Sequence, residues 1–284
     1  MDINAQTRFC GVIGNPVEHS LSPAIHNAAF QKLGLNFVYL AWRVESIGDA
    51  IKGLRALGNF RGASVTIPHK VGVMPFLDEI EPTARYIGAI NTVVAENGML
   101  TGSNTDATGA LRALREGGAP LKGESAIMLG SGGAARAIAF ALATESGIRR
   151  LHLLGIEEKE RLTLAADLRT KTPVNVVDAY LDEAVLKQVL PEARALIHCT
   201  PVGMAPKTGK SCVPASLLHR ELTVMDIVYN PRETQLLKDA KAAGCRTIAG
   251  LEMFLHQAAA QFELWTGRPA PIDVMRGVLE SRFS

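Results

Sequence analysis

The sequence predicts an α/β protein of two domains, the second built on a doubly wound parallel sheet. Short apolar stretches alternate with amphipathic ones along the 284 residues, and a glycine cluster follows the apolar run at 126–129. A glycine pair, Gly117 and Gly118, separates two such alternating halves. Strands that alternate with helices are typical of a parallel sheet covered by helices on both faces.

The amino-terminal half predicts an α/β pattern of its own. Strands are expected at residues 9–13, 37–44 and 63–67, with amphipathic helices at 23–33 and 47–57. Asn97-Gly98 is a strong hairpin signal between apolar runs at 90–94 and 99–101. A further helix is expected at residues 107–115.

Several polar residues stand at the ends of these elements. Ser22 is expected to cap the helix that Pro23 begins, but that role does not explain Ser20. A pair of hydroxyls at a helix N-terminus also suits a carboxylate. Lys70 follows a strand end, where a lone lysine is ordinarily a solvated surface residue. Asp106 is expected as an N-cap at the junction of the two halves, where a cleft would bring a substrate to a cofactor.

The glycine cluster has the context of a dinucleotide-binding loop. A buried strand at 126–129 is followed by G-x-G-G-A-A-R and an apolar helix. Glycines without Cβ atoms let the backbone approach a pyrophosphate, and the amides at the start of the helix face its charge. The loop residues are Gly130, Ser131, Gly132, Gly133 and Ala134. Glycine turns also join strands to helices in many other α/β proteins, so the flanking strand and helix carry part of this interpretation.

The rest of the chain continues the alternation. Strands are expected at 150–154, 173–177, 194–199 and 224–228, and helices at 163–171, 181–190 and 236–243. Gly250 precedes a long helix with an apolar stripe, and a short helix at 271–281 closes the chain. We therefore expect a substrate domain at 1–105, a dinucleotide-binding domain at 106–245, and carboxy-terminal helices at 246–284 that pack on the first domain.

Composition narrows the class of protein. The net charge is +2 with 20% charged residues, so no basic field suggests a nucleic-acid partner. The polar first nine residues lack a signal core, and no segment approaches the apolar length of a membrane span. The four cysteines form no C-x-x-C pair and suggest reduced residues in a cytoplasmic protein without a metal site.

Eight motifs in order resemble the shikimate dehydrogenase family, including its quinate/shikimate relatives. They are GNPVEHSLSPAIHN, SVTIPHK, GAINTV, GSNTDATG, GSGGAARA, TPVGM, DIVYNP and GLEMFLHQA, and they run nearly end to end. The resemblance implies an α/β substrate domain, a Rossmann-type domain and a carboxy-terminal helix that returns to the first. It also implies an oxidoreductase that reversibly reduces 3-dehydroshikimate to shikimate with NAD(P)H.

The resemblance assigns roles to individual positions. It implies a catalytic pair at Lys70 and Asp106, with Lys70 exchanging the alcohol proton and Asp106 orienting the ammonium. The implied substrate contacts are Ser20, Ser22 and Tyr229 at the carboxylate, and Thr66, Asn91 and Gln257 at the ring hydroxyls. The implied cofactor contacts are Gly130, Ser131, Gly132, Gly133, Ala134, Glu157, Thr200, Val228 and Gly250.

Two positions depart from the family pattern. Ser64 stands where the family usually has Asn, which shortens one contact to a ring hydroxyl. Gly155-Ile156-Glu157 replaces the Asn-Arg-Thr whose Arg faces the 2′-phosphate of NADP. Because a carboxylate repels that phosphate and suits a free ribose hydroxyl, these residues favour NAD or dual use, whereas the family favours NADP. Lys159 or Arg161 could still hold the phosphate.

Two other functions stay open at this point. The main substrate could be quinate or a related hydroxylated ring acid, and initial rates on both acids with each cofactor would decide. A ligand-sensing module of the same fold would show no NAD(P)-dependent absorbance change, although the presence of Lys70 and Asp106 argues against it. The chain could be a monomer or a homodimer.

Overall fold

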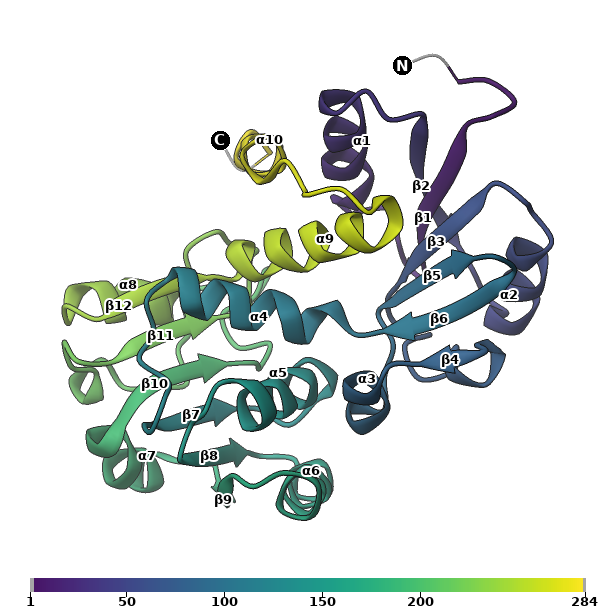
Figure 1. Cartoon of the computed structure of the whole chain (residues 1–284). Helices are drawn as coiled ribbons and strands as arrows, with labels where there is room; N and C mark the ends of the chain where they lie inside the picture. Colours follow the sequence, from purple (N-terminus) through teal and green to yellow (C-terminus); the bar gives the residue numbers. More distant parts are fainter. Residues whose placement is uncertain (1–2, 283–284) are drawn as a thin grey trace. The chain divides into compact units, whose positions relative to one another are not determined.

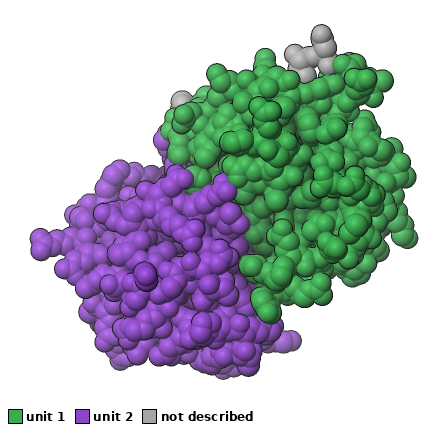
Figure 2. All heavy atoms as spheres, in the orientation of Figure 1, with its two compact units in different colours: residues 1–105, 255–284 green, residues 106–254 purple. Residues whose placement is uncertain are grey.

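The computed structural model describes residues 3–282, which form two compact units. One unit contains residues up to 105 together with those from 255 onward, and the other contains residues 106–254 (Figure 2). Within the described residues, no helix combines the length and apolar character needed to cross a bilayer. Each unit is built around its own six-stranded sheet (Figure 1).

The sheet of the first unit is mixed. Its strand order is β2-β1-β3-β5-β6-β4. The strands are β1 (Arg8–Gly14), β2 (Phe37–Arg43), β3 (Phe60–Val65), β4 (Glu79–Ile80), β5 (Thr92–Glu96) and β6 (Met99–Ser103). β1 pairs in parallel with β2 and β3, whereas β5 is antiparallel to both β3 and β6. The hairpin of β5 and β6 turns at Asn97 and Gly98, with φ of 51° and 80°, as the sequence predicts.

Helices from both ends of the chain pack on this unit. They are α1 (Ser22–Lys32), α2 (Ile47–Arg55), α3 (Pro82–Ile87), α10 (Ile272–Glu280) and the later turns of α9 (Gly250–Thr266), with a 3₁₀ turn η1 at Met74–Phe76. α10 packs against α1, and Trp265 of α9 donates from Nε1 to the Val93 carbonyl at 3.0 Å. Trp265 is buried, so this bond satisfies a donor that burial would otherwise leave unpaired.

The sheet of the second unit is parallel throughout. Its order is β12-β11-β10-β7-β8-β9. β7, the first of these strands in the sequence, lies in the middle, with β8 and β9 on one side and β10, β11 and β12 on the other, so the strand order reverses between β7 and β10. The strands are β7 (Ser125–Leu129), β8 (Arg150–Gly155), β9 (Asn175–Tyr180), β10 (Ala193–His198), β11 (Thr223–Asp226) and β12 (Arg246–Ala249). All five residues of β7 are buried, as expected for a strand covered on both faces.

The helices of this unit confirm the predicted alternation. They are α4 (Thr105–Glu116), α5 (Gly133–Glu145), α6 (Glu158–Lys171), α7 (Glu183–Val189), α8 (Gln235–Ala242) and the first residues of α9, with 3₁₀ turns η2 (Leu190–Glu192) and η3 (Ala215–Leu217). The doubly wound order is that of dinucleotide-binding proteins, which bind their ligand at the carboxyl ends of the strands where the order reverses.

Three local predictions are wrong. Ser22 is the first helical residue of α1, and Leu21 takes the N-cap position without a side-chain cap. Asp106 lies inside the first turn of α4, which begins at Thr105, so it is not the N-cap. The segment 246–284 is predicted to consist of helices, but its first four residues form β12, which pairs in parallel with β11.

Candidate active site

The two central strands of the parallel sheet end in loops that touch each other. Gly130 follows β7 with φ of +105°, a conformation that favours glycine. A Cβ atom there would lie 3.0 Å from the Cys199 carbonyl and 3.2 Å from Cγ2 of Thr200, in the loop after β10. The Gly130 amide donates to the Leu154 carbonyl of β8 at 2.7 Å. The glycine is therefore required for the close approach of the two loops.

The loop beyond Gly130 is open toward its surroundings. Gly132 and Gly133 are exposed, and a Cβ atom at either would meet nothing within 4 Å. Gly132 is the N-cap of α5 and offers no side chain to the first amides of the helix, while Ser131 and Ala134 are half-buried. These amides lack intrahelical acceptors and form an anion-binding end. The loop therefore fits a dinucleotide pyrophosphate.

The end of β8 presents an acidic side chain. Glu157 is exposed and is the N-cap of α6, but its carboxylate makes no capping hydrogen bond. Arg161, which could have faced a 2′-phosphate, is buried instead. Its Nη1 donates to the Gly155 carbonyl at 2.8 Å and its Nε to Asp178 at 3.2 Å. Lys159 is exposed in the first turn of α6. Of the two cations that could hold a 2′-phosphate, Lys159 and Arg161, only Lys159 is therefore accessible.

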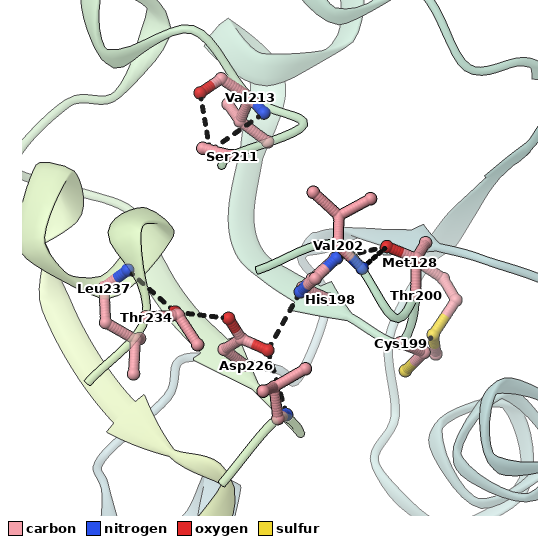
Figure 3. A network of polar contacts seen from close by, with 11 residues as sticks. Met128, His198, Cys199, Thr200, Val202, Ser211, Val213, Asp226, Thr234 and Leu237 are labelled. Atoms are coloured by element: carbon pink, nitrogen blue, oxygen red, sulfur yellow. Dashed lines mark hydrogen bonds and ion pairs between the residues drawn. The ribbon is translucent and has the colours of Figure 1, made fainter. Parts of the chain in front are cut away.

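A buried polar network joins the ends of β10 and β11 (Figure 3). Nδ1 of His198 lies 2.9 Å from Oδ1 of Asp226, and Nε2 lies 2.5 Å from Oγ1 of Thr200. Asp226 also accepts from the Val228 amide at 3.0 Å and from the Thr234 hydroxyl at 2.6 Å. Thr200 and Val228, both predicted as cofactor contacts, are therefore held by one histidine–carboxylate pair. The sequence interpretation missed His198. Its only signal is that it is a polar residue at the end of an apolar strand.

Gly250 marks a second close approach at this end of the sheet. A Cβ atom on Gly250 would lie 2.4 Å from the Ile227 carbonyl, so a larger residue would push the start of α9 away from the end of β11. Tyr229, three residues beyond β11, is 40% exposed, with its ring centroid 5.5 Å from that of Phe254. Burial of part of this ring raises the pKa of Tyr229, so its hydroxyl remains a hydrogen-bond donor at neutral pH.

In the first unit, Lys70 lies in a turn just beyond β3, as predicted. β3 ends at Val65, two residues earlier than expected, and Thr66 follows it half-buried. The Lys70 carbonyl accepts from the Ile90 amide at 2.8 Å, and the His69 amide donates to the Thr66 carbonyl at 2.9 Å. His69 Nε2 lies 2.7 Å from the Val44 carbonyl. These bonds fix the backbone from which the half-buried Lys70 side chain extends.

Asn91 lies beside this turn at the centre of a second polar network. Its Oδ1 accepts from the Thr92 hydroxyl at 2.7 Å and from the Thr105 amide at 2.7 Å. Gln261 of α9 donates to the Thr92 hydroxyl at 3.0 Å and accepts from the Ser64 hydroxyl at 2.8 Å. The orientation of the Asn91 amide is therefore fixed, which directs its Nδ2 group away from the network.

Gln257 of α9, a predicted substrate contact, and Ser64 of β3, which replaces the Asn usual in the family, differ in their surroundings. Gln257 is buried one helical turn before Gln261, on the same face of α9. The Ser64 hydroxyl, which donates to Gln261, lies 2.6 Å from the Tyr39 hydroxyl. Ser64 is therefore occupied inside the protein. Gln261 was missed from the sequence, although its spacing from Gln257 is a usable signal.

The serine pair lies at the start of α1. Ser20 is half-buried, and its Oγ accepts from the Ser22 amide at 3.3 Å. Ser22 is 6% exposed and lies close enough to Tyr39 to affect the pKa of its phenol. Burial raises the pKa of Tyr39 and keeps its phenol protonated. Ser20 is therefore the more exposed hydroxyl of the pair, and Ser22 is the more buried one.

We expect Ser20→Ala and Ser22→Ala to raise KM for a ring carboxylic acid more than they lower kcat. A carboxylate does not change during hydride transfer, so the lost binding is uniform between ground and transition states. A hydrogen bond to a charged group is worth about 1.5–3 kcal/mol, so KM should rise about tenfold or more. Steady-state kinetics with varied acid and saturating cofactor measure both constants.

The matched control is Ser46→Ala, which removes another serine that precedes a helix of the same unit. Because Ser22 does not cap α1, no loss of helix capping is expected in Ser22→Ala. An unchanged KM in Ser20→Ala would remove the carboxylate role from that position.

The structure groups the predicted residues by unit. Ser20, Ser22, Thr66, Lys70, Asn91 and Gln257 belong to the first unit, whereas Asp106, Tyr229 and all predicted cofactor residues belong to the second. Among the described residues, no group of three or more His, Cys, Asp or Glu side chains could hold a metal ion. The pairing of Lys70 with Asp106 stays a prediction.

Comparisons with known proteins identify relatives of this chain. Residues 12–93 match the shikimate dehydrogenase substrate binding domain, and residues 250–280 match the shikimate 5′-dehydrogenase C-terminal domain. The chain is 45% identical to the shikimate dehydrogenase (NADP(+)) of Desulforamulus reducens, over 99% of this chain and 98% of that protein. The fold and the match together define the class of NAD(P)-dependent oxidoreductases. Within that class, the chain belongs to the shikimate dehydrogenase family.

Solved structures give the same result. A shikimate 5-dehydrogenase from Listeria monocytogenes, in complex with shikimate and NAD, is 37% identical with a TM-score of 0.94, and 98% of each chain is covered. A quinate dehydrogenase from Corynebacterium glutamicum, in complex with NAD, is 32% identical with a TM-score of 0.90, covering 97% of this chain and 99% of that one. Both cofactors therefore occur among the named relatives.

Proposed function

We propose that this protein catalyses the reversible NAD(P)-dependent reduction of 3-dehydroshikimate to shikimate. The observation that carries the proposal is the 45% identity to a shikimate dehydrogenase over nearly the whole of both chains. The glycine loop after β7 and the fixed turn around Lys70 support it, because the reaction requires a dinucleotide site and a proton donor.

A substrate-by-cofactor matrix tests the proposal. Purified protein would be mixed with shikimate or quinate and with NADP⁺ or NAD⁺, and formation of the reduced cofactor would be followed by absorbance. We expect the highest kcat/KM with shikimate. The absence of any absorbance change with every combination would favour a ligand-sensing module instead.

In the proposed site, hydrogen-bond donors of the first unit orient the acid. Ser20 and Ser22 bind the carboxylate, with Tyr229 of the second unit as a further donor. Thr66, Asn91 and Gln257 bind the ring hydroxyls. The fixed Asn91 amide supports this role, since its Oδ1 is used by Thr92 and Thr105 and its Nδ2 remains to donate. Such fixed donors lower the entropy cost of aligning the reacting carbon.

Lys70 and Asp106 are the proposed proton-transfer residues. Nicotinamide, when bound, supplies or accepts the hydride at the ring carbon. Lys70 donates a proton to the carbonyl oxygen during reduction and accepts it from the alcohol during oxidation. Asp106 orients the ammonium group through a charge-assisted hydrogen bond and shares its proton. No metal is needed to polarise the carbonyl when a positioned ammonium does so.

The proposed cofactor residues all lie at the carboxyl ends of the second sheet. The amides of the loop from Gly130 to Ala134 bind the pyrophosphate, and Glu157 accepts from the ribose hydroxyls. Thr200 and Val228 lie at the ends of β10 and β11, and Gly250 begins the helix that packs against the latter. The open loop and the uncapped carboxylate support these roles.

We predict that kcat/KM with NAD equals or exceeds that with NADP. The exposed Glu157 carboxylate would face a 2′-phosphate with like charge, and Arg161 is held by Asp178 and the Gly155 carbonyl. Glu157→Ala should raise KM for NAD by about tenfold, since hydrogen bonds to a charged acceptor are lost. Initial rates with each cofactor at saturating shikimate provide the measurement.

Glu160→Ala is the matched control, because Glu160 is another exposed acid in the first turn of α6. If NADP were strongly preferred, Lys159 would be the cation that binds the phosphate. Lys159→Ala should then weaken NADP selectively, and the assignment of Glu157 to the ribose would be wrong.

Quinate is the second candidate substrate. The quinate dehydrogenase of known structure covers nearly the whole chain, and Ser64 replaces an amide that the family usually presents to a ring hydroxyl. Because Ser64 donates to Gln261, its hydroxyl hydrogen is not available to a ring hydroxyl. Quinate would become the main substrate if its kcat/KM exceeded that of shikimate in the matrix above.

We also propose a cytoplasmic location and a monomeric or homodimeric state, with small molecules rather than nucleic acid or membrane as partners. Cys10, Cys199, Cys212 and Cys245 are all free thiols, which fits a reducing compartment. Size-exclusion chromatography with light scattering measures the oligomeric state directly.

A further inference from the structure

The second unit buries a complete charge pair at the ends of β10 and β11. Asp226 is fully buried, and His198 is 1% exposed. A buried carboxylate is costly unless a cation or several donors compensate it. Asp226 receives Nδ1 of His198, the Val228 amide and the Thr234 hydroxyl, which supply three donors (Figure 3). These donors favour an ionised Asp226, and a negative charge 2.9 Å from Nδ1 favours the protonated form of His198.

The hydrogen bonds that the Thr200 hydroxyl accepts then determine where its own hydrogen can point. Its Oγ1 lies 2.5 Å from Nε2 of His198 and accepts a hydrogen bond from the Val202 amide at 3.2 Å. When the imidazole is protonated, both ring nitrogens are donors, so Oγ1 accepts twice and both of its lone pairs are used. The hydroxyl hydrogen of Thr200 must then point to a third acceptor. Thr200 also lies against Gly130 of the glycine loop, where its Cγ2 would be 3.2 Å from an added Cβ.

We propose that His198 is a positioning residue for cofactor binding, which acts by directing the Thr200 hydroxyl to donate to an oxygen of the bound nicotinamide dinucleotide. This proposal rests on the proposed function for the identity of the ligand and for the contact of Thr200 with it. A neutral imidazole that keeps its hydrogen on Nδ1 for Asp226 turns Nε2 into an acceptor. The Thr200 hydroxyl then donates to His198 and is lost to the cofactor.

The groups that face His198 set the pH at which this reversal occurs. They are Asp226 from β11, Thr200 from the loop after β10 and Cys212 from the loop before η3. Burial by itself lowers the pKa of His198, but the hydrogen bonds and charge interactions with Asp226 and Cys212 outweigh it and raise the pKa to about 9. Cofactor affinity should therefore be constant near neutral pH and fall as pH rises through about 9.

The test is a fluorescence titration of the protein with NADH from about pH 7 to about pH 10, which brackets the His198 pKa. NADH is the probe because its phosphate charge is constant over this range. We expect the wild-type dissociation constant to rise about tenfold with a midpoint near pH 9, the loss typical of one hydrogen bond to a charged group. Thr200→Val should bind about tenfold more weakly near neutral pH and show no such rise.

His198→Gln, which stays neutral, should also remove the rise. The control is His152→Gln, which changes another buried histidine of the same sheet and should keep the wild-type profile. A flat wild-type profile, or a Thr200→Val profile that retains the rise, would overturn the proposal. Both of these measurements remain decisive if His198→Gln fails to fold.

Thermal unfolding of the protein without cofactor gives an independent readout. The pKa of His198 is higher in the folded state than the ordinary 6.5, so its contribution to stability is complete below about pH 6.5 and is lost as pH rises through about 9. His198→Gln should lack this loss. Turnover of shikimate is measured separately. Its absence would defeat the proposed function, whereas a pH-dependent affinity for NADH would leave the role of His198 intact.

Discussion

Lys70→Ala is expected to lower kcat by about 10²- to 10⁴-fold, the usual contribution of a general acid–base residue. The side chain is proposed to donate the carbonyl proton, and alanine removes it without a substitute. The fold should survive, because the turn is held by backbone bonds such as that from the Ile90 amide to the Lys70 carbonyl. Steady-state rates with shikimate and saturating cofactor measure the effect.

The binding of shikimate separates a catalytic role from a structural one. Calorimetric titration of Lys70→Ala should give a dissociation constant close to that of the wild type, since the carboxylate and hydroxyl donors are unchanged. Lys52→Ala provides the matched control, because Lys52 is an exposed lysine of α2 in the same unit. Near-native kcat in Lys70→Ala would show that another group transfers the proton.

The parts of the fold that were predictable are those with strong local signals. The apolar run of β7, the glycines after it and the apolar start of α5 determine a strand–turn–helix unit by local sequence alone. Asn97 and Gly98 adopt the left-handed backbone that their residue types favour. The order of the eight family motifs then allowed the fold of the whole chain to be predicted.

Short elements and helix ends were not predictable in the same way. β4 has two residues and β12 four, too few for a periodic pattern, and both depend on pairing with a neighbouring strand. Ser22 has the residue type of an N-cap, but its side chain is buried inside the unit and Leu21 takes the cap position. Tertiary contacts therefore override the local preference at this position.

The supporting residues of the site were hidden for a different reason. Ser64 and Gln261 form a hydrogen bond across 197 positions of sequence, and His198 and Asp226 across 28. No local pattern connects such pairs. Arg161 shows an error of another kind, in which the sequence position suggested a role that the structure does not support. Its position in sequence suggested a phosphate ligand, but it is buried against Asp178 and the Gly155 carbonyl.

The position of Asp106 allows a substitution there to separate a catalytic role from a helix-capping role. As an N-cap it would have a structural role that Asn could preserve, but it lies within the first turn of α4 and is half-buried. The preceding residue, Thr105, is fixed by its amide and hydroxyl to Oδ1 of Asn91. The backbone that carries Asp106 is therefore anchored on its amino-terminal side without help from its carboxylate.

Asp106→Asn is expected to lower kcat by about 10²-fold or more, because the neutral amide cannot share a proton with Lys70 or stabilise its ammonium form. The loss of an acid from the first turn of a helix should reduce the free energy of unfolding by at most about 1 kcal/mol. Chemical denaturation and steady-state kinetics on the same preparation separate the two effects. Asp49→Asn, in the first turn of α2, removes the same kind of helix-end charge and should leave kcat unchanged. If Asp106→Asn lost stability but kept its activity, the carboxylate would serve the helix, and the proton relay would have to be assigned to another partner of Lys70.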